Sequence, residues 1–384
     1  MAAARADGER APGRERGKGT GRAWAELLRL PALFTVPGDA LAGAAAAGAR
    51  PNPRTLLAIG SSLCLYEAGM ALNDWADQAE DAVDRPHRPL PSGRIRPAAA
   101  LAAAGALTAA GLALAARAGG RSLAVAVPLA VTVWAYDLGL KRTPAGPAAM
   151  AAARGLDLLL GAAATGGRPR PALPAALTLA THTFAVTSVS RGETRGGSHT
   201  APLAALLTTG AVVWGLTRSR PAADTDRGPQ SAHRGTPGSD AGIRRSRPAS
   251  GQGSRISTHR GTPDVGSPSS RPGQSPRIPA HLGTPAVRRL SSSPGSGPGT
   301  PPTPADAVRT ALTVAYAVTS ARPLFHAALH PSPPLTQRAV GGGIRAMIPL
   351  QAALAARAGA PAVAVLTVLL APAARKFARK VSVT

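Results

Sequence analysis

Five acidic residues fall within twelve positions, 73–84, directly after an apolar segment. Asn73, Asp77 and Asp81 are spaced four apart, so they share one face of a helix, and Asp74 and Asp84 each stand three from a member of that row. Carboxylate and amide oxygens suit Mg²⁺, which keeps several waters and bridges protein carboxylates to phosphate. Carboxylates this close repel one another unless a cation neutralises them. The pattern therefore predicts a cation and phosphate site, with a solvated acidic loop as the alternative.

Three basic segments can hold the phosphate end of a ligand. Arg85 and Arg88 follow the acidic cluster, and arginine fits phosphate oxygens with two parallel hydrogen bonds. Lys141, one of only four lysines, lies in the stretch 136–142 between two apolar segments. Its ammonium can hold a phosphate oxygen, and an ordinary positively charged loop is the alternative. Arg29 stands at the start of the first apolar segment and is a further candidate for the phosphate end.

A third polar stretch, 188–197, carries Arg191 and Arg195 around a single carboxylate, Glu193. Three more acids lie inside apolar segments, where charges are costly and usually functional. They are Asp39, Glu67 and Asp157. Asp157 follows Arg154 by three residues, which also fits a structural ion pair within one helix.

The elements that must position these residues follow from composition. The 384 residues carry 44 Lys and Arg against 19 Asp and Glu, a net charge of +25 that first suggests a nucleic-acid partner. Aromatic residues make up only 3%, which argues against a stacking platform for single strands, and the single cysteine, Cys64, excludes a disulfide scaffold. Yet the mean hydropathy is close to zero, so the chain mixes two unlike materials. We predict no nucleic-acid partner.

The first material is a series of apolar segments rich in Ala, Leu, Val and Gly, about as long as a bilayer span. Charges are confined between them, which favours membrane helices over buried soluble ones. We therefore predict an all-α, polytopic membrane bundle of about nine helices. The segments are 27–48, 55–72, 98–116, 122–140, 145–166, 171–189, 200–217, 306–321, 339–357 and 360–374.

The second material cannot bury a core. Residues 1–22 hold six basic and three acidic residues and read as a disordered basic arm. Residues 218–305 contain 28 Gly and Pro in 88 positions, no aromatic residue and three copies of a His-x-Gly-Thr-Pro phrase, so they read as a disordered insert. The predicted domains are therefore the arm, a first bundle part at 23–217, the insert, and a second bundle part at 306–384.

The acidic cluster, read as Asn-Asp-x-x-Asp-x-x-x-Asp and followed by Arg-Pro-x-Pro-Ser-Gly, resembles the UbiA family of intramembrane prenyltransferases. The resemblance implies that this motif binds the Mg²⁺-diphosphate of a prenyl donor. The residues that match in place are Asn73, Asp74, Asp77 and Asp81. Lys141 lies in a stretch similar to the family's Tyr-x-x-x-Leu-Lys element.

The stretch around Arg191 stands where the family carries a second Asp-rich motif, and this sequence departs from it. Only Glu193 remains of the expected paired carboxylates. Either the arginines replace a cation in holding diphosphate, or the fold has lost transferase chemistry. Within the family, the runs 28–39, 190–193 and 343–351 look like the divergent bacterial EboC-like branch.

The resemblance implies a Mg²⁺-dependent prenyltransferase that moves a prenyl group from a prenyl diphosphate to an unidentified small molecule, with aromatic compounds and natural products as the candidate acceptors. Asp77, Asp81 and Lys141 are the predicted catalytic residues. The predicted metal ligands are Asp74, Asp77, Asp81 and Glu193. The predicted diphosphate-binding residues are Asn73, Arg85, Arg88, Lys141, Arg191 and Arg29.

With the basic N-terminus in the cytoplasm, alternating crossings place the motif loops 73–97, 137–147 and 190–199 on the cytoplasmic face of the cell membrane. A rival hypothesis is a non-catalytic membrane protein of the same fold that binds or moves a lipid-linked metabolite. A CDP-alcohol phosphotransferase is disfavoured because its Asp-Gly-x-x-Ala-Arg run does not occur. A soluble terpene synthase does not need this many apolar segments.

Overall fold

The structure is a computed structural model, and it describes residues 21–28, 35–192, 198–218 and 303–382. The predicted arm and insert therefore lie almost wholly outside the described residues, and their predicted disorder stays a prediction. One difference is visible at the edge of the arm, where residues 21–27 are helical.

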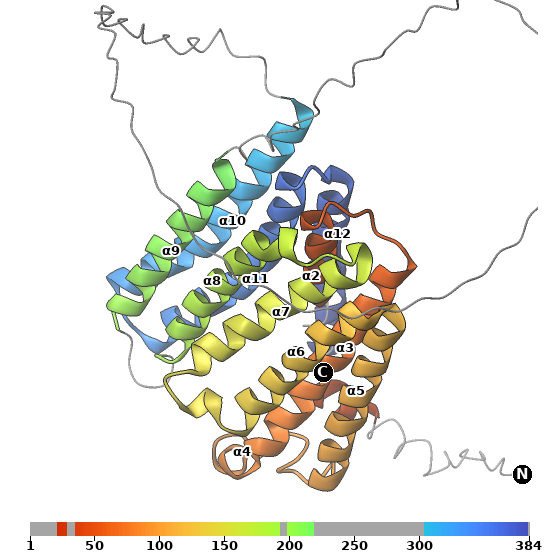
Figure 1. The fold of residues 1–384 in the computed structure, drawn as a ribbon. Helices are drawn as coiled ribbons and strands as arrows, with labels where there is room; N and C mark the ends of the chain where they lie inside the picture. Colours follow the sequence, from red (N-terminus) through yellow and green to blue (C-terminus); the bar gives the residue numbers. More distant parts are fainter. Residues whose placement is uncertain (1–20, 29–34, 193–197, 219–302, 383–384) are drawn as a thin grey trace, which may run out of the picture. The chain divides into compact units, whose positions relative to one another are not determined.

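The described part of the chain is helical and contains no strand. Its helices follow one another as shown in Figure 1. They are α2 Val36–Ala46, α3 Pro53–Ala76, α4 Gln78–Asp84, α5 Pro97–Ala118, α6 Gly120–Leu138, α7 Gly146–Gly166, α8 Leu173–Ser190, α9 Thr200–Thr217, α10 Pro304–Leu329, α11 Pro333–Arg357 and α12 Pro361–Ser382, with 3-10 turns at Leu140–Arg142 and Arg170–Ala172.

Seven stretches within the described residues are long and apolar enough to cross a membrane. They are α3, α5, α6, α7, the stretch Arg170–Ser190 that contains α8, α9 and α11. This number of apolar helices indicates a multi-pass membrane protein, as the sequence predicted.

The structure corrects the first predicted span. In place of an unbroken span over 27–48, the described helix α2 has eleven residues, which is about 16 Å and half the thickness of the hydrocarbon layer. Pro37 stands at the start of α2, where proline favours helix initiation. For the described helix α2, the apolar composition therefore predicted burial correctly, but the helix is shorter than the predicted span.

The predicted boundaries near the C-terminus also change. The predicted span 306–321 is the first part of α10, which continues through Pro323 to Leu329, and α11 begins at Pro333 rather than at residue 339. Basic residues between 322 and 338 lower the local hydropathy, so hydropathy alone did not show where α10 ends and α11 begins. Thr303 starts α10 by accepting a hydrogen bond from the Asp306 backbone N–H at 3.2 Å.

The short helix α2 is almost wholly buried and packs against α3, α7, α11 and α12. Small residues allow this close approach. A Cβ on Gly43 would lie 2.0 Å from the carbonyl oxygen of Leu158, and a Cβ on Gly161 would lie 2.4 Å from the Cα of Ala40. Backbones of α2 and α7 are therefore in direct contact, as is common where membrane helices meet at glycine.

Candidate functional site

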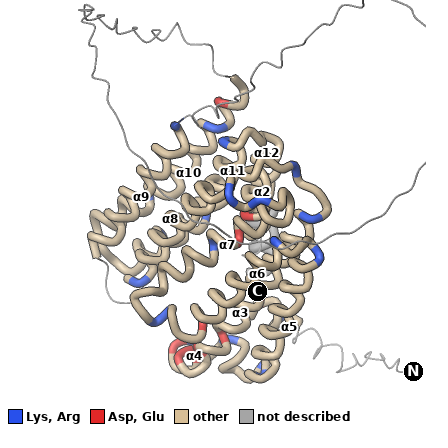
Figure 2. The backbone as a smooth tube through the Cα atoms, viewed as in Figure 1, with Lys and Arg blue, Asp and Glu red and all other residues tan. Residues whose placement is uncertain are grey.

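The acidic cluster lies where α3 meets α4. Asp77 ends α3 and precedes α4, and the helical pattern of hydrogen bonds continues across it, from Asp77 N–H to the Asn73 carbonyl at 3.0 Å and from Asp81 N–H to the Asp77 carbonyl at 2.8 Å. The row of Asn73, Asp77 and Asp81 therefore keeps its four-residue spacing through the junction. Figure 2 shows acidic segments gathered at α4.

Arg88 holds the two most deeply buried carboxylates of this cluster. Its Nη1 lies 2.6 Å from Asp81 Oδ2 and 3.5 Å from Asp74 Oδ1, while Asp81 and Asp74 are only 2% and 5% exposed. Arg85 adds a longer contact to Asp81 at 3.3 Å. The predicted basic segment after the acidic cluster therefore folds back onto it.

Lys141 comes from the 3-10 turn after α6 and reaches the same cluster. Its Nζ lies 2.7 Å from Asp77 Oδ1, donates to Asn73 Oδ1 at 3.2 Å and stands 4.0 Å from Asp137 Oδ1. Arg142 also contacts Asp77 Oδ1, at 3.1 Å. Two stretches 68 residues apart in sequence thus form one charged site, in keeping with the predicted placement of both loops on one face of the membrane.

Arg94 fixes the loop that carries Arg88. Its guanidinium donates to Glu26 at 2.7 and 3.2 Å and to the His87 carbonyl at 2.5 Å, so this loop is tied to the helical segment 21–27. The hydrogen bond to Glu26 favours the charged guanidinium and raises the pKa of Arg94.

The remaining predicted site residues are placed differently or lie outside the described part. Arg191 donates to the Thr143 carbonyl at 2.6 Å and to the Lys141 carbonyl at 3.5 Å, so it supports the backbone of the Lys141 turn. Its contacts are thus to main-chain oxygens. Arg29 and Glu193 fall outside the described residues.

The oxygen donors at this junction match the preference of Mg²⁺ in kind, with three carboxylates and one amide oxygen. Within the described residues, however, no group of three or more His, Cys, Asp or Glu side chains converges to hold a metal. Each of these carboxylates instead contacts a basic side chain. The donor set therefore fits Mg²⁺ chemically, provided that Arg88 and Lys141 exchange their carboxylate contacts for those of an incoming anion.

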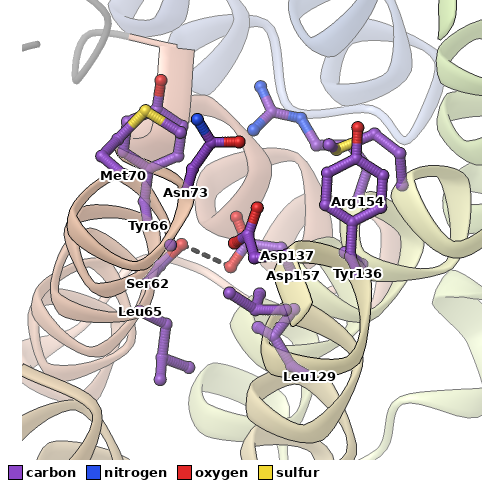
Figure 3. A pocket seen from close by; sticks show the side chains of 14 residues that line it. Ser62, Leu65, Tyr66, Met70, Asn73, Leu129, Tyr136, Asp137, Arg154 and Asp157 are labelled. Carbon is purple, nitrogen blue, oxygen red and sulfur yellow. Dashed lines mark hydrogen bonds between the residues drawn. The ribbon is translucent and has the colours of Figure 1, made fainter. Parts of the chain in front are cut away.

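A cavity of about 300 Å³ lies between α3, α6 and α7, next to this junction. Figure 3 shows polar side chains that lie around it, among them Asn73, Tyr136 and Asp137. Its apolar lining includes Leu65, Leu129 and Val133. The cavity thus has a polar end, at Asn73 and Asp137, and an apolar wall suited to a hydrocarbon chain.

A buried polar network lies on another side of the cavity. Arg154 and Asp157 of α7 both line it, and Ser62 of α3 donates a hydrogen bond to Asp157. Arg154 Nε lies 3.1 Å from Asp39 Oδ2, and Gln351 donates to Asp39 Oδ1 at 2.7 Å. The ion pair of Arg154 is therefore with Asp39 of α2, across the bundle, and not the local pair with Asp157 that sequence spacing suggested.

Sequence reasoning missed three residues at the site. Asp137 is 4% exposed and lines the cavity, Arg142 contacts Asp77, and Ser62 binds Asp157. Asp137 carried a usable signal, because it precedes Lys141 by four residues at the end of an apolar segment. Ser62 carried none, because its importance arises only from the packing of α3 against α7.

Comparison with known proteins agrees with the motifs. The family described as UbiA prenyltransferase family matches residues 34–218. A digeranylgeranylglyceryl phosphate synthase of Methanopyrus kandleri is 34% identical over 158 residues, which cover 40% of this chain and 56% of the relative. A protein of the same name from Halobacterium salinarum is 32% identical over 191 residues, which cover 49% of this chain and 68% of the relative.

Two solved structures are also similar. The apo structure of a UbiA homolog from Aeropyrum pernix has 20% identity and a TM-score of 0.43, over 48% of this chain and 76% of that one. A UbiA homolog from Archaeoglobus fulgidus, bound to DMAPP and Mg²⁺, has 20% identity and a TM-score of 0.42, over 50% and 76%.

The chain spans about half the length of the first curated relatives that it matches. These relatives do not test the predicted EboC-like branch, which stays a prediction. The match to the Halobacterium salinarum protein has 32% identity and covers 68% of that protein, which is enough to establish common family membership. Together with the family match over 34–218, it shows that this chain belongs to the UbiA prenyltransferase family.

Proposed function

We propose that the protein is an integral membrane prenyltransferase that takes a prenyl group from a prenyl diphosphate and attaches it to a small-molecule acceptor. One observation carries the proposal. Lys141 and Arg88 converge from two separate loops on the carboxylates at the α3–α4 junction, and Asn73 joins that junction to a cavity with an apolar wall. A charged site beside an apolar cavity matches a ligand with a diphosphate head and a hydrocarbon tail.

The diphosphate is held by Lys141, Arg88 and Arg85, whose contacts to carboxylates show that they already point toward the junction. The ligands for Mg²⁺ are Asp74, Asp77 and Asp81, with Asn73 assisting. The bound cation supplies charge neutralisation for the diphosphate. Arginine and lysine aimed at the leaving group stabilise the negative charge that develops there, which is the largest source of rate in many enzymes.

The reaction breaks the allylic C–O bond of the donor, and the diphosphate leaves with the electron pair. The carbon centre then bonds to a nucleophilic atom of the acceptor, which loses one proton. Asp137, buried at the cavity next to Lys141, is placed to receive that proton. Leu129 and Val133 line the same cavity and limit water, which would otherwise capture the carbon centre.

The acceptor carries a hydrogen-bonding group in this proposal. Arg154 and Asp157 lie at the cavity wall and offer it a donor and an acceptor.

We assign the motif loops and the N-terminus to the cytoplasmic side of the cell membrane, because the segments 1–22 and 85–96 are rich in arginine.

A second candidate function is a membrane protein that binds a prenyl diphosphate or a lipid-linked metabolite without catalysis. One observation favours it. Arg191, at the place of the second acidic motif, is used to hold the backbone at Thr143 and brings no second carboxylate pair to the site.

Diphosphate release from the detergent-solubilised protein separates the two functions. Dimethylallyl, geranyl and geranylgeranyl diphosphate are each offered with and without Mg²⁺ and with a panel of phenolic and alcohol acceptors. Asp77→Asn is compared with Glu80→Gln, which removes a charge from an exposed position of α4, the short helix that follows Asp77. Transfer by the wild type and by E80Q, lost in D77N, supports the transferase. Donor binding without release by any of the three favours the binding protein, and equal turnover in all three overturns the site.

A further inference from the structure

A second pocket lies between α10 and α11, and it is distinctly basic. Its volume is about 240 Å³, and its lining includes three arginines and one histidine. The lining residues are Arg322, Pro323, His326, Leu335, Arg338 and Arg345. All four basic side chains are exposed.

Helix geometry explains why these side chains gather. Arg322 and His326 are four residues apart on α10, and Arg338 and Arg345 are seven apart on α11, so each pair occupies one face of its helix. The two helices approach closely at Gly342, where a Cβ would lie 2.8 Å from Pro323 Cγ. This contact brings the two basic faces to opposite sides of one groove.

Among the described residues, no carboxylate forms an ion pair with the basic side chains of this pocket. Asp306 is the last acidic residue of the sequence, and it pairs with Arg309 at the far end of α10. The neighbouring helices α8 and α9 contain no acid either. The only red segment on α10 in Figure 2 is at its start. Three arginines that share a pocket repel one another, so the arrangement is stabilised when an anion binds.

The position of the pocket along the membrane points to a lipid. α11 is one of the apolar helices long enough to cross a bilayer, and Arg338 and Arg345 stand about 8 and 18 Å along it from its start. Such depths are costly for an unpaired charge. The Arg345 guanidinium turns back toward Gly341, that is, toward the α10–α11 turn, as a side chain does that reaches for the interface.

Exposed apolar side chains accompany the basic ones. Phe325, Leu329 and Ile344 are 54%, 54% and 50% exposed, respectively. A ligand that spans basic and apolar neighbours has an anionic head and hydrocarbon chains. A soluble anion would use the arginines alone.

The pocket also lies at the same end of the bundle as the proposed active site. His199 Nδ1 lies 2.6 Å from the Ala328 carbonyl at the end of α10, which ties the turn after α10 to the loop that follows Arg191. Arg191 in turn holds Thr143 beside Lys141. A bound head group therefore stands on the membrane face that the proposed active site uses.

We propose that the groove between α10 and α11 binds the phosphate head group of an anionic phospholipid through Arg322, Arg338 and Arg345, with its acyl chains against Phe325 and Ile344. Guanidinium groups bind phosphate oxygens bidentately. This site is separate from the donor site, so it stands or falls independently of the proposed reaction.

The test measures lipid retention by native mass spectrometry. Wild type, Arg338→Gln/Arg345→Gln and a control, Arg117→Gln/Arg170→Gln, are released from nanodiscs of equal phosphatidylcholine and phosphatidylglycerol. The control removes two exposed arginines, from the end of α5 and from the 3-10 turn before α8, outside the groove. We expect retained phosphatidylglycerol in wild type and control, and at least a tenfold lower fraction in the groove variant. Equal retention in all three overturns the proposal.

Two further arms define the ligand and guard against misfolding. Arg338→Lys/Arg345→Lys keeps the charge and is expected to recover most of the retained lipid. Inorganic phosphate and short-chain phosphatidylglycerol are then compared for their effect on the melting temperature in neutral detergent. A larger rise with the lipid, absent from the groove variant, supports the assignment, and an equal rise with inorganic phosphate overturns the lipid as ligand.

Discussion

Lys141 Nζ lies 2.7 Å from Asp77 Oδ1 and joins the turn after α6 to the end of α3. The lysine side chain is 11% exposed and the aspartate 20%, so the pair is shielded from solvent without being fully buried. Lys141 also contacts Asn73, which lines the cavity. The pair is therefore accessible to an incoming diphosphate, which can take the place of the carboxylate beside the ammonium.

Replacing Lys141 by methionine should abolish most of the transfer reaction. Methionine keeps much of the volume and removes the charge that faces the leaving group, which typically costs about 10²–10³ in turnover. Asp77 keeps Arg142 as a partner, so the fold should survive. Donor turnover and melting temperature are measured together, with Arg117→Met as the matched control. Turnover within threefold of wild type in K141M would show that this lysine does not touch the donor.

Arg88 and Asp81 should show strong coupling in a double-mutant cycle. Arg88→Gln leaves the 2%-exposed carboxylate of Asp81 with only the longer contact from Arg85, and breaking such a pair costs about 3 kcal/mol. Asp81→Asn in the same chain removes the unpaired charge and should restore part of the melting temperature without restoring turnover. Arg85→Gln, at a 54%-exposed side chain, should change stability by about 0–1 kcal/mol. Additive effects of R88Q and D81N would mean that the two residues do not interact.

Much of this site could be predicted from sequence because its chemistry is local. Asn73, Asp77 and Asp81 form one row at fixed spacing, and the basic residues follow within a few positions. The approach of the Lys141 turn to the acidic cluster was also expected, because alternating crossings place loops 73–97 and 137–147 on one membrane face. The direct pair of Lys141 with Asp77 was not predicted and is seen only in the structure.

Other features had no local signal. Arg154 has Asp157 three residues away, yet it pairs with Asp39, because α2 and α7 touch backbone to backbone and bring that carboxylate closer. Hydropathy likewise predicted a full span for the first apolar segment, because composition indicates burial and does not show where a helix begins. The described helix α2 begins next to Pro37 and has only eleven residues. The basic groove between α10 and α11 was invisible for a similar reason, since its residues are spread over 24 positions.

The contact between α2 and α7 should make Gly161 intolerant of any side chain. A Cβ there would lie 2.4 Å from Ala40 Cα, a backbone atom that cannot move aside. Gly161→Ala should therefore lower the melting temperature and separate Arg154 from Asp39. Gly210→Ala is the matched control, because it also adds a methyl group to a helical glycine but meets nothing within 4 Å. The control should be neutral or more stable by up to about 1 kcal/mol. Equal melting temperatures for both variants would contradict the close packing described.

Arg154 should be required for folding mainly because of the carboxylate that it neutralises. Arg154→Met leaves Asp39 fully buried without its cation, and loss of one partner of a buried pair costs about 3–5 kcal/mol. The double variant Arg154→Met/Asp39→Asn should regain most of the lost stability. If the cavity wall also binds the acceptor, the rescued protein should show a raised KM for the acceptor and an unchanged KM for the donor. An unchanged KM for the acceptor together with a raised KM for the donor would show that the acceptor binds elsewhere.

Mg²⁺ should matter for the donor and not for the fold. The carboxylates at the α3–α4 junction already contact Arg88, Lys141 and Arg142, so they need no cation to remain together. The melting temperature of the free protein should therefore be the same in EDTA and in millimolar Mg²⁺. With geranyl diphosphate at about a hundred times its Kd, Mg²⁺ should add about 2.7 kcal/mol of stability by linkage. Asp77→Asn should remove that gain and Glu80→Gln should keep it. A gain from the donor that is equally large in EDTA would show that the basic residues alone hold the diphosphate.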